Sequence, residues 1–203
     1  MVVYADERGM TLIELLMVIA ILGVLAAIAL PMTGSAVRYA KISGDARNIS
    51  NQIAVTKMRA AAKFTQARVY VDLTGKTYYV QTCNTPGTSP CPAWTTETGS
   101  TSLANTVSFD YTPAASAPLN TQTTIGQADQ CYNSDSPPVA VSGTACIIFN
   151  SRGIPVDRVG SPTNNYALYL TDGSFIYGIT VAATGFIQTW RTSASAAPTW
   201  SVQ

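Results

Sequence analysis

The chain has 203 residues, a formal net charge of +1 and only 11% charged residues. This composition excludes a strongly basic nucleic-acid-binding protein, and the length allows one globular domain of ordinary size beside one further helix. The chain also contains no histidine, the residue that most often serves as a general base or a zinc ligand.

The first element expected along the chain is a long apolar helix. Residues 12–30 are apolar except for one charge, Glu14, and Gly9 precedes them. A helix of this length is roughly 30 Å long, which is enough to span a bilayer. A carboxylate inside such a span costs on the order of 2–4 kcal/mol at mid-membrane and less near an interface. Glu14 therefore needs a specific role.

These residues resemble the start of the type IV pilin-like proteins. In that family a peptidase cuts after a glycine that precedes the apolar segment, and a glutamate is the fifth residue of the mature chain. Counted from Met10, Glu14 is the fifth residue and Pro31 is the twenty-second. The resemblance implies cleavage between Gly9 and Met10, N-methylation of Met10, and assembly roles for Glu14 and Pro31.

Two ordinary alternatives explain the apolar run less completely. A secretory signal would have a basic start, an apolar core of about 7–15 residues and a small-x-small cleavage site. Residues 27–29 could serve as that site, but the apolar run is longer than such a core and contains Glu14. A plain single-span anchor explains the length and leaves Glu14 without a role.

An amphipathic helix is expected to continue over residues 34–64. Pro31 and Gly34 should kink or loosen the helix, because proline removes a backbone hydrogen bond. Beyond them, apolar residues recur at spacings of three, four and seven, which predicts one buried stripe on a helix that ends near Lys63. The stripe consists of Ile42, Ala46, Ile49, Ile53, Ala60 and Phe64.

Basic residues gather in this region with a single acid, Asp45. They are Arg38, Lys41, Arg47, Lys57, Arg59, Lys63 and Arg68. A solvated helix face explains them more simply than a dedicated anion-binding surface. The charge distribution therefore gives no direct indication of a nucleic-acid partner.

Residues 65–203 are predicted to form a β-rich globular domain with a polar loop region at 83–146. Thr74-Gly75-Lys76 and Asp172-Gly173 are hairpin signals between apolar runs, and residues 83–144 are rich in Ser, Thr, Pro, Asn and Gly. The predicted class is α+β, with the long N-terminal helix packed on an antiparallel β-sheet domain. Strands are expected at 68–73, 77–82, 106–111, 145–149, 166–170, 175–181 and 186–190.

Four cysteines lie in or beside the polar loop region: Cys83, Cys91, Cys131 and Cys146. An even number in an exported domain suggests two disulfides, for which three pairings are possible. Proximity in the sequence favours Cys83 with Cys91 and Cys131 with Cys146. Zinc is not expected, because the spacings do not suit a zinc site and histidine is absent.

The residues suggest no catalytic site. There is no Gly-rich phosphate loop, and the eleven acids are scattered, so no nucleophile–base pair or paired acid and base can be assembled. Asp157 and Asp172 could approach each other and hold calcium, but two carboxylates make a weak site and Asp172 is better explained by its turn. We expect no enzyme activity, no metal and no cofactor.

Two later features resemble the GspH/FimT/FimU-type minor pseudopilins and pilins. One is the alanine-rich helix end at 58–63, which a strand follows at once. The other is the run IIFNSRGIP, followed by two strands and a last strand that a glycine begins. The resemblance implies a structural and assembly subunit of a type II secretion pseudopilus or a type IV pilus.

The same resemblance implies where the chain acts and with what. Residues 1–9 would be the leader that prepilin peptidase removes, and residues 10–33 would cross the inner membrane, with the globular domain in the periplasm. Later the chain would enter a filament. The implied partners are other pilin or pseudopilin subunits, the peptidase, an inner-membrane assembly platform and, before assembly, membrane lipid.

Two alternative functions remain open. Some FimT-type minor pilins bind DNA through a basic Gly-Arg-x-Arg motif, but the corresponding segment here, residues 185–188, reads Gly-Phe-Ile-Gln, with only Arg191 nearby. A major or adhesive pilin subunit is the other alternative, since the polar loop region could face outward.

Overall fold

The protein is described by a computed structural model that covers residues 10–97, 99–135, 137–164 and 166–203, without the side chains of residues 28–33. The predicted leader, including Gly9, lies outside the described residues. The chain divides into two compact units, Met1–Tyr39 and Ala40–Gln203. Helix α1 (Leu12–Ala62) belongs to both of them.

Helix α1 is a single element. Its secondary structure is unbroken through Pro31 and Gly34, although proline removes one backbone hydrogen bond inside a helix. The weakening of the helix at these two residues therefore stays a prediction, and residues 34–62 continue the same helix.

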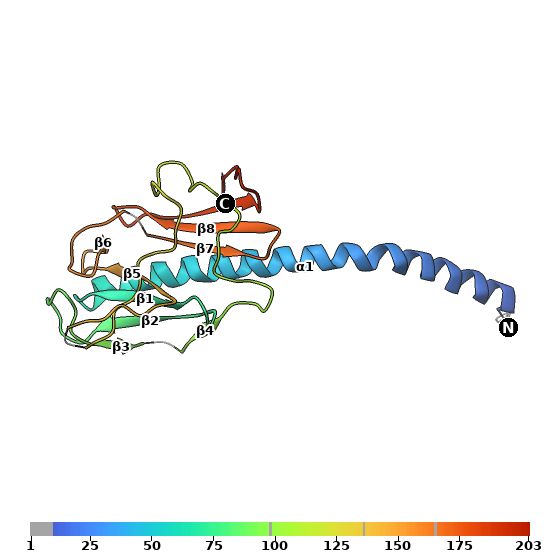
Figure 1. Cartoon of the computed structure of the whole chain (residues 1–203). Coiled ribbons are helices and arrows are strands. Elements are labelled where there is room, and N and C mark those ends of the chain that lie inside the picture. The colour runs from blue at the N-terminus through green and yellow to red at the C-terminus, as the bar shows by residue number, and fades with distance from the viewer. Residues whose placement is uncertain (1–9, 98, 136, 165) are drawn as a thin grey trace, which may run out of the picture. The chain divides into compact units, whose positions relative to one another are not determined.

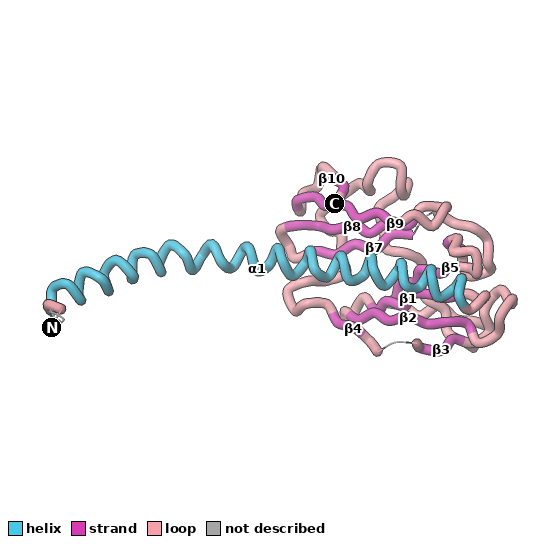
Figure 2. The backbone as a smooth tube through the Cα atoms, turned by 180° about the vertical axis from the view of Figure 1, so that it is seen from behind, coloured by secondary structure: helices cyan, strands magenta, loops and turns pink. Residues whose placement is uncertain are grey.

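The strands form two antiparallel sheets in the unit Ala40–Gln203 (Figures 1 and 2). The first sheet has the order β3-β2-β1-β5-β6, with β4 also paired to β2. The second has the order β10-β9-β8-β7. The predicted α+β class is thus confirmed, with two sheets in place of one. The bounds are β1 (Ala67–Asp72), β2 (Thr77–Cys83), β3 (Trp94–Thr96), β4 (Thr101–Ser102), β5 (Thr144–Phe149), β6 (Pro155–Val156), β7 (Tyr166–Thr171), β8 (Phe175–Val181), β9 (Ile187–Ser193) and β10 (Ser201–Val202).

The apolar stripe of α1 packs into one core with both sheets. Ile42, Ala46, Ile49, Ile53 and Ala60 are fully buried, together with side chains of β1, β5, β7 and β8. Burial of this apolar area is the main force that holds helix and sheets together.

Two positions of the stripe differ from the sequence prediction. Phe64 is 78% exposed, because it lies beyond the end of α1 in a left-handed conformation with a φ of 51°. Thr56 is fully buried instead, and its hydroxyl donates a hydrogen bond to the carbonyl oxygen of Gln52, at 2.7 Å. A helix can bury a threonine in this way because its own backbone satisfies the hydroxyl.

The predicted strand at 106–111 is wrong. In this segment only Ser108 pairs with a strand, through an isolated bridge to Thr171 of β7. The rest of that edge is covered by the side-chain amide of Gln127, which donates to the Tyr169 carbonyl (3.0 Å) and accepts from the Tyr169 N–H (2.9 Å). The Ala128 N–H bonds the Ala167 carbonyl at 2.7 Å. Loop residues therefore form hydrogen bonds with the backbone groups on the outer edge of β7.

Candidate functional site

The start of α1 is organised around Thr11 and Glu14. The Glu14 N–H lies 3.3 Å from Thr11 Oγ1 and 3.1 Å from the Thr11 carbonyl oxygen, so Thr11 caps the helix. A threonine followed three residues later by glutamate is the capping-box pattern, which the sequence analysis missed. A carboxylate in the first turn also faces the positive end of the helix dipole. Glu14 therefore suits the helix start as well as its predicted assembly role.

The large apolar side chains of residues 12–25 are all exposed, by 41% to 77%. They occur on every side of the helix, which is typical of a helix that lipid or other protein surrounds rather than water. A continuous exposed apolar surface of this kind marks an interaction site. The residues are Leu12, Ile13, Leu15, Leu16, Met17, Val18, Ile19, Ile21, Leu22, Val24 and Leu25.

Within the part of the chain that is described, no stretch of helix is both long and apolar enough to cross a membrane.

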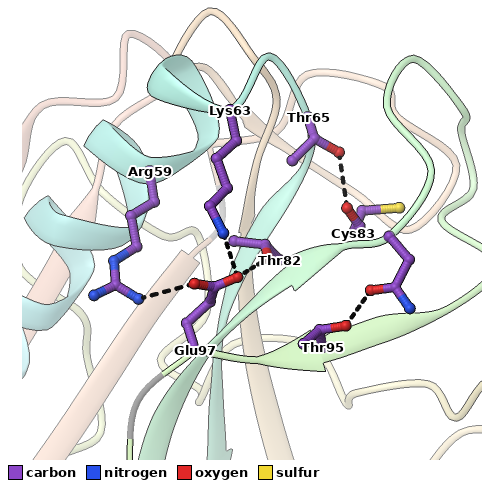
Figure 3. A network of polar contacts seen from close by, with 8 residues as sticks. Arg59, Lys63, Thr65, Thr82, Cys83, Thr95 and Glu97 are labelled. Carbon is purple, nitrogen blue, oxygen red and sulfur yellow. Dashed lines mark hydrogen bonds and ion pairs between the residues drawn. The ribbon is translucent and has the colours of Figure 1, made fainter.

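The other end of α1 is fastened to the first sheet through Glu97 (Figure 3). Lys63 Nζ and Thr82 Oγ1 both donate to Glu97 Oε1, each at 2.5 Å. Arg59 Nη1 lies 3.7 Å from Oε2, which is too long for a hydrogen bond, so its contribution is electrostatic only. The hydrogen bonds from Lys63 and Thr82 hold the pKa of Glu97 below its usual range.

Lys57 joins the C-terminal part of α1 to two loops. Its Nζ donates to the carbonyl oxygen of Gly185 at 2.9 Å, and its side chain passes Gly153 so closely that an added Cβ there would lie 2.9 Å from Lys57 Cε. Both glycines have positive φ angles, 72° and 76°. The turn after β5 and the turn before β9 therefore both contact the side chain of Lys57.

The basic residues do not form one solvated face. Arg38, Lys41, Arg47 and Lys63 are exposed, whereas Lys57 and Arg59 are partly buried. The one acid of the region, Asp45, accepts the Ala104 N–H at 2.9 Å, and burial raises its pKa. The basic residues near the end of α1 thus contact the globular domain, while those before them are open to solvent.

Arg68 is buried in the first sheet, with only 5% of the residue exposed. Its guanidinium lies 4.2 Å from the Trp94 ring centroid and donates to Gln81 Oε1 (2.8 Å) and the Tyr132 carbonyl (3.0 Å). Burial lowers its pKa to about 10. Cation–π contact and carbonyl acceptors partly replace the water that this charge loses.

Both disulfides lie beside Arg68. Cys83 is bonded to Cys91 and Cys131 to Cys146, which is the pairing that proximity in the sequence favours. Cys91, Cys131 and Cys146 line a cleft of about 470 Å³ together with Arg68 and Trp94. The disulfides thus fasten the polar loop region to β2 and β5.

The two aspartates considered for calcium serve separate turns. Asp157 Oδ1 accepts the N–H groups of Val159 and Ser161, and Asp172 Oδ1 accepts those of Ser174 and Phe175. Among the described residues, no three His, Cys, Asp or Glu side chains gather as a metal ion would require.

Residues 5–30 match the family model described as the prokaryotic N-terminal methylation motif. The chain therefore carries the N-terminal signal of type IV pilin-like proteins, which confirms the resemblance of this segment. Among solved structures, it is similar to the minor pseudopilin EpsH from the type 2 secretion system of Vibrio cholerae, with 11% sequence identity and a TM-score of 0.37. That similarity covers 80% of this chain and 96% of the other. No curated protein matches the sequence.

Proposed function

We propose that this protein is a minor pilin or pseudopilin, a structural and assembly subunit of a type II secretion pseudopilus or a type IV pilus. One observation carries the proposal. Inside the matched methylation motif, residues 12–25 present an exposed apolar helix whose first turn contains a single carboxylate, Glu14. Such a helix suits lipid before assembly and a bundle of like helices afterwards.

In the proposed pathway, prepilin peptidase hydrolyses the Gly9–Met10 bond and methylates the new amine of Met10. The leader 1–9 is lost, residues 10–33 form the membrane and assembly segment, and residues 34–64, helical as far as Ala62, lead into the domain of residues 65–203. The inner-membrane assembly platform then receives the subunit. The two disulfides support a periplasmic domain, because disulfides persist in oxidising compartments.

Assembly in this proposal depends on an ion pair between subunits. Glu14 of an incoming chain pairs with the Met10 amine of its neighbour, and the apolar side chains around them exclude water. In such a setting the attraction is strong, and leaving one partner unpaired is costly. Glu14 thus sets the register of neighbouring helices, and Pro31 allows local melting of the helix.

The variant Glu14→Ala tests this role. We expect the variant to reach the membrane fraction in normal amount and to be absent from sheared filaments. The matched control is Glu7→Ala, which removes a carboxylate from the predicted leader and so leaves the mature chain unchanged. Normal entry of Glu14→Ala into filaments would contradict the role of Glu14.

Peptide mass spectrometry of the chain N-terminus tests the processing step. We expect a mature chain that begins at methylated Met10, present in small amounts in the sheared fraction. A chain that dominates that fraction would mean a major subunit. A chain that begins at Leu30 would mean an ordinary signal peptide, and the pilin proposal would then be wrong.

A further inference from the structure

A second hollow lies at the end of the β8–β9 hairpin, and the proposed function does not use it. Its volume is about 380 Å³, and none of its described lining residues carries a formal charge. We call it the hairpin pocket. Its lining contains three large apolar side chains, Leu119, Phe186 and Trp190, and three amides, Asn120, Asn164 and Gln188.

Two of the apolar side chains of the hairpin pocket are open to solvent, and the third is fixed in orientation. Phe186 is 61% exposed and Leu119 is 83% exposed. Phe186 follows a tight turn in which the Ala182 N–H bonds the Phe186 carbonyl at 2.9 Å. The indole N–H of Trp190 donates to Thr180 Oγ1, also at 2.9 Å, which fixes the orientation of that ring. A fixed indole ring and an exposed phenyl ring therefore line one hollow.

The amides add groups that both donate and accept hydrogen bonds. Within the described residues, the side chains of Asn120, Asn164 and Gln188 bond to no other group. Asn120 has a φ of 60°, a left-handed turn conformation that asparagine adopts more readily than most residues. The three side-chain amides can thus form hydrogen bonds with a ligand.

We propose that the hairpin pocket binds a neutral carbohydrate. A sugar ring has an apolar C–H face that can pack on Phe186 and Trp190, and its hydroxyls can both donate to and accept from amides. A charged ligand would lose hydration in this pocket without meeting an opposite charge. A purely apolar ligand would bury the amides without partners.

Saturation-transfer NMR on the full chain tests the proposal. The chain is kept in a detergent without a sugar headgroup, and the probes are hexamers of glucose and of N-acetylglucosamine, beside an anionic hexamer of galacturonic acid. We expect saturation of at least one neutral probe and none of the anionic one. Phe186→Ala should weaken binding about tenfold, the size of one lost ring contact.

Phe64→Ala is the matched control, because it removes an exposed phenylalanine that does not line the hairpin pocket. We expect it to leave binding unchanged. No saturation of either neutral probe, or equal binding by Phe186→Ala and the parent chain, would overturn the proposal. An uncharged Ser/Thr-rich peptide is a further probe, and saturation of that peptide alone would mean a peptide groove instead. None of these readouts depends on filament assembly, so they test the pocket separately from the proposed function.

Discussion

At the scale of single residues, Gly185 is a position where backbone, not only side chain, blocks a substitution. A Cβ at this residue would lie 2.4 Å from the Gly153 carbonyl oxygen and 3.0 Å from Lys57 Nζ. In the sequence, Gly153 belongs to the run IIFNSRGIP, and Gly185 is the glycine that begins the last predicted strand. The sequence could not show that these two glycines both lie against Lys57 of α1. Spacing along a chain does not reveal which helix residue two distant turns contact.

Substitution of Gly185 should therefore be costly. We expect Gly185→Ala to lower the free energy of unfolding by roughly 2–4 kcal/mol, since it adds both left-handed strain and a backbone clash. Gly173→Ala is the control, because Gly173 has a φ of 85° and no atom within 4 Å of an added Cβ. That variant should lose only about 1 kcal/mol. Urea unfolding followed by tryptophan fluorescence measures both, and equal losses would refute the clash.

At Phe64, by contrast, a glycine is expected to be better tolerated than an alanine. It occupies the left-handed position of a Schellman cap, since the Thr65 N–H bonds the Ala60 carbonyl (3.1 Å) and the Phe64 N–H bonds the Ala61 carbonyl (3.3 Å). Glycine is the usual residue there. We expect Phe64→Gly to be more stable than Phe64→Ala by about 1 kcal/mol in the same urea assay. A more stable Phe64→Ala would contradict this interpretation of the helix end.

At the scale of elements, the join between α1 and the first sheet should depend on pH. The pKa of Glu97 is lowered in the folded protein, mainly by the hydrogen bonds from Lys63 and Thr82. Below the usual pKa of about 4.5, the unfolded chain binds this proton more readily than the folded chain does. The stabilisation is therefore complete above that pH and is lost as the pH falls through the folded pKa.

The stability of the parent chain and of Glu97→Gln should be compared between pH 2.5 and 7. We expect the parent to be more stable near neutral pH and the difference to shrink below about pH 4.5. A difference that stays constant over this range would show that the Glu97 charge does not hold the helix end to the sheet.

The two disulfides of the polar loop region should contribute unequally to the free energy of unfolding. Cys131–Cys146 closes a separation of 15 residues and both of its cysteines are buried, so its removal should cost about 3 kcal/mol or more. Cys83–Cys91 closes a separation of 8, and Cys91 is only half-buried. Paired Cys→Ala variants, compared by thermal unfolding, measure the two losses. A larger loss for Cys83–Cys91 would reverse this ranking.

Clear apolar patterns and turn signals allowed the main elements to be predicted, and their absence explains the misses. Residues 166–170 and 175–181 are apolar runs on either side of the turn signal Asp172-Gly173, and they form β7 and β8 as expected. The strands β3, β4, β6 and β10 have only two or three residues, too few for any pattern. The segment 106–111 has strand-like residues, but its place beside β7 is largely taken by the amide of Gln127, a contact between distant residues.

At the scale of the whole molecule, the division at Tyr39 and Ala40 falls just before the buried stripe begins at Ile42. A fragment of residues 40–203 keeps every core residue of its unit. We expect it to unfold cooperatively, with a melting temperature within a few degrees of that of the full chain.

A fragment of residues 50–203 is the control for that prediction. It lacks Ile42, Ala46 and Ile49, which are fully buried, and we expect it to lose several kcal/mol or to fail to fold. Circular dichroism on heating compares the two fragments. If both melt alike, the start of the stripe does not stabilise the domain.

The covered edge of β7 has a consequence for a subunit that works among copies of itself. In a filament of the proposed kind, neighbouring domains are tethered at very high local concentration. At that concentration, an unpaired strand edge would pair with a strand of a neighbouring domain, which leads to irreversible aggregation. Ser108, Gln127 and Ala128 already occupy the hydrogen-bonding groups of β7. The outer edge of β7 is therefore already paired within its own domain, so that contacts between such neighbouring domains would have to use other surfaces.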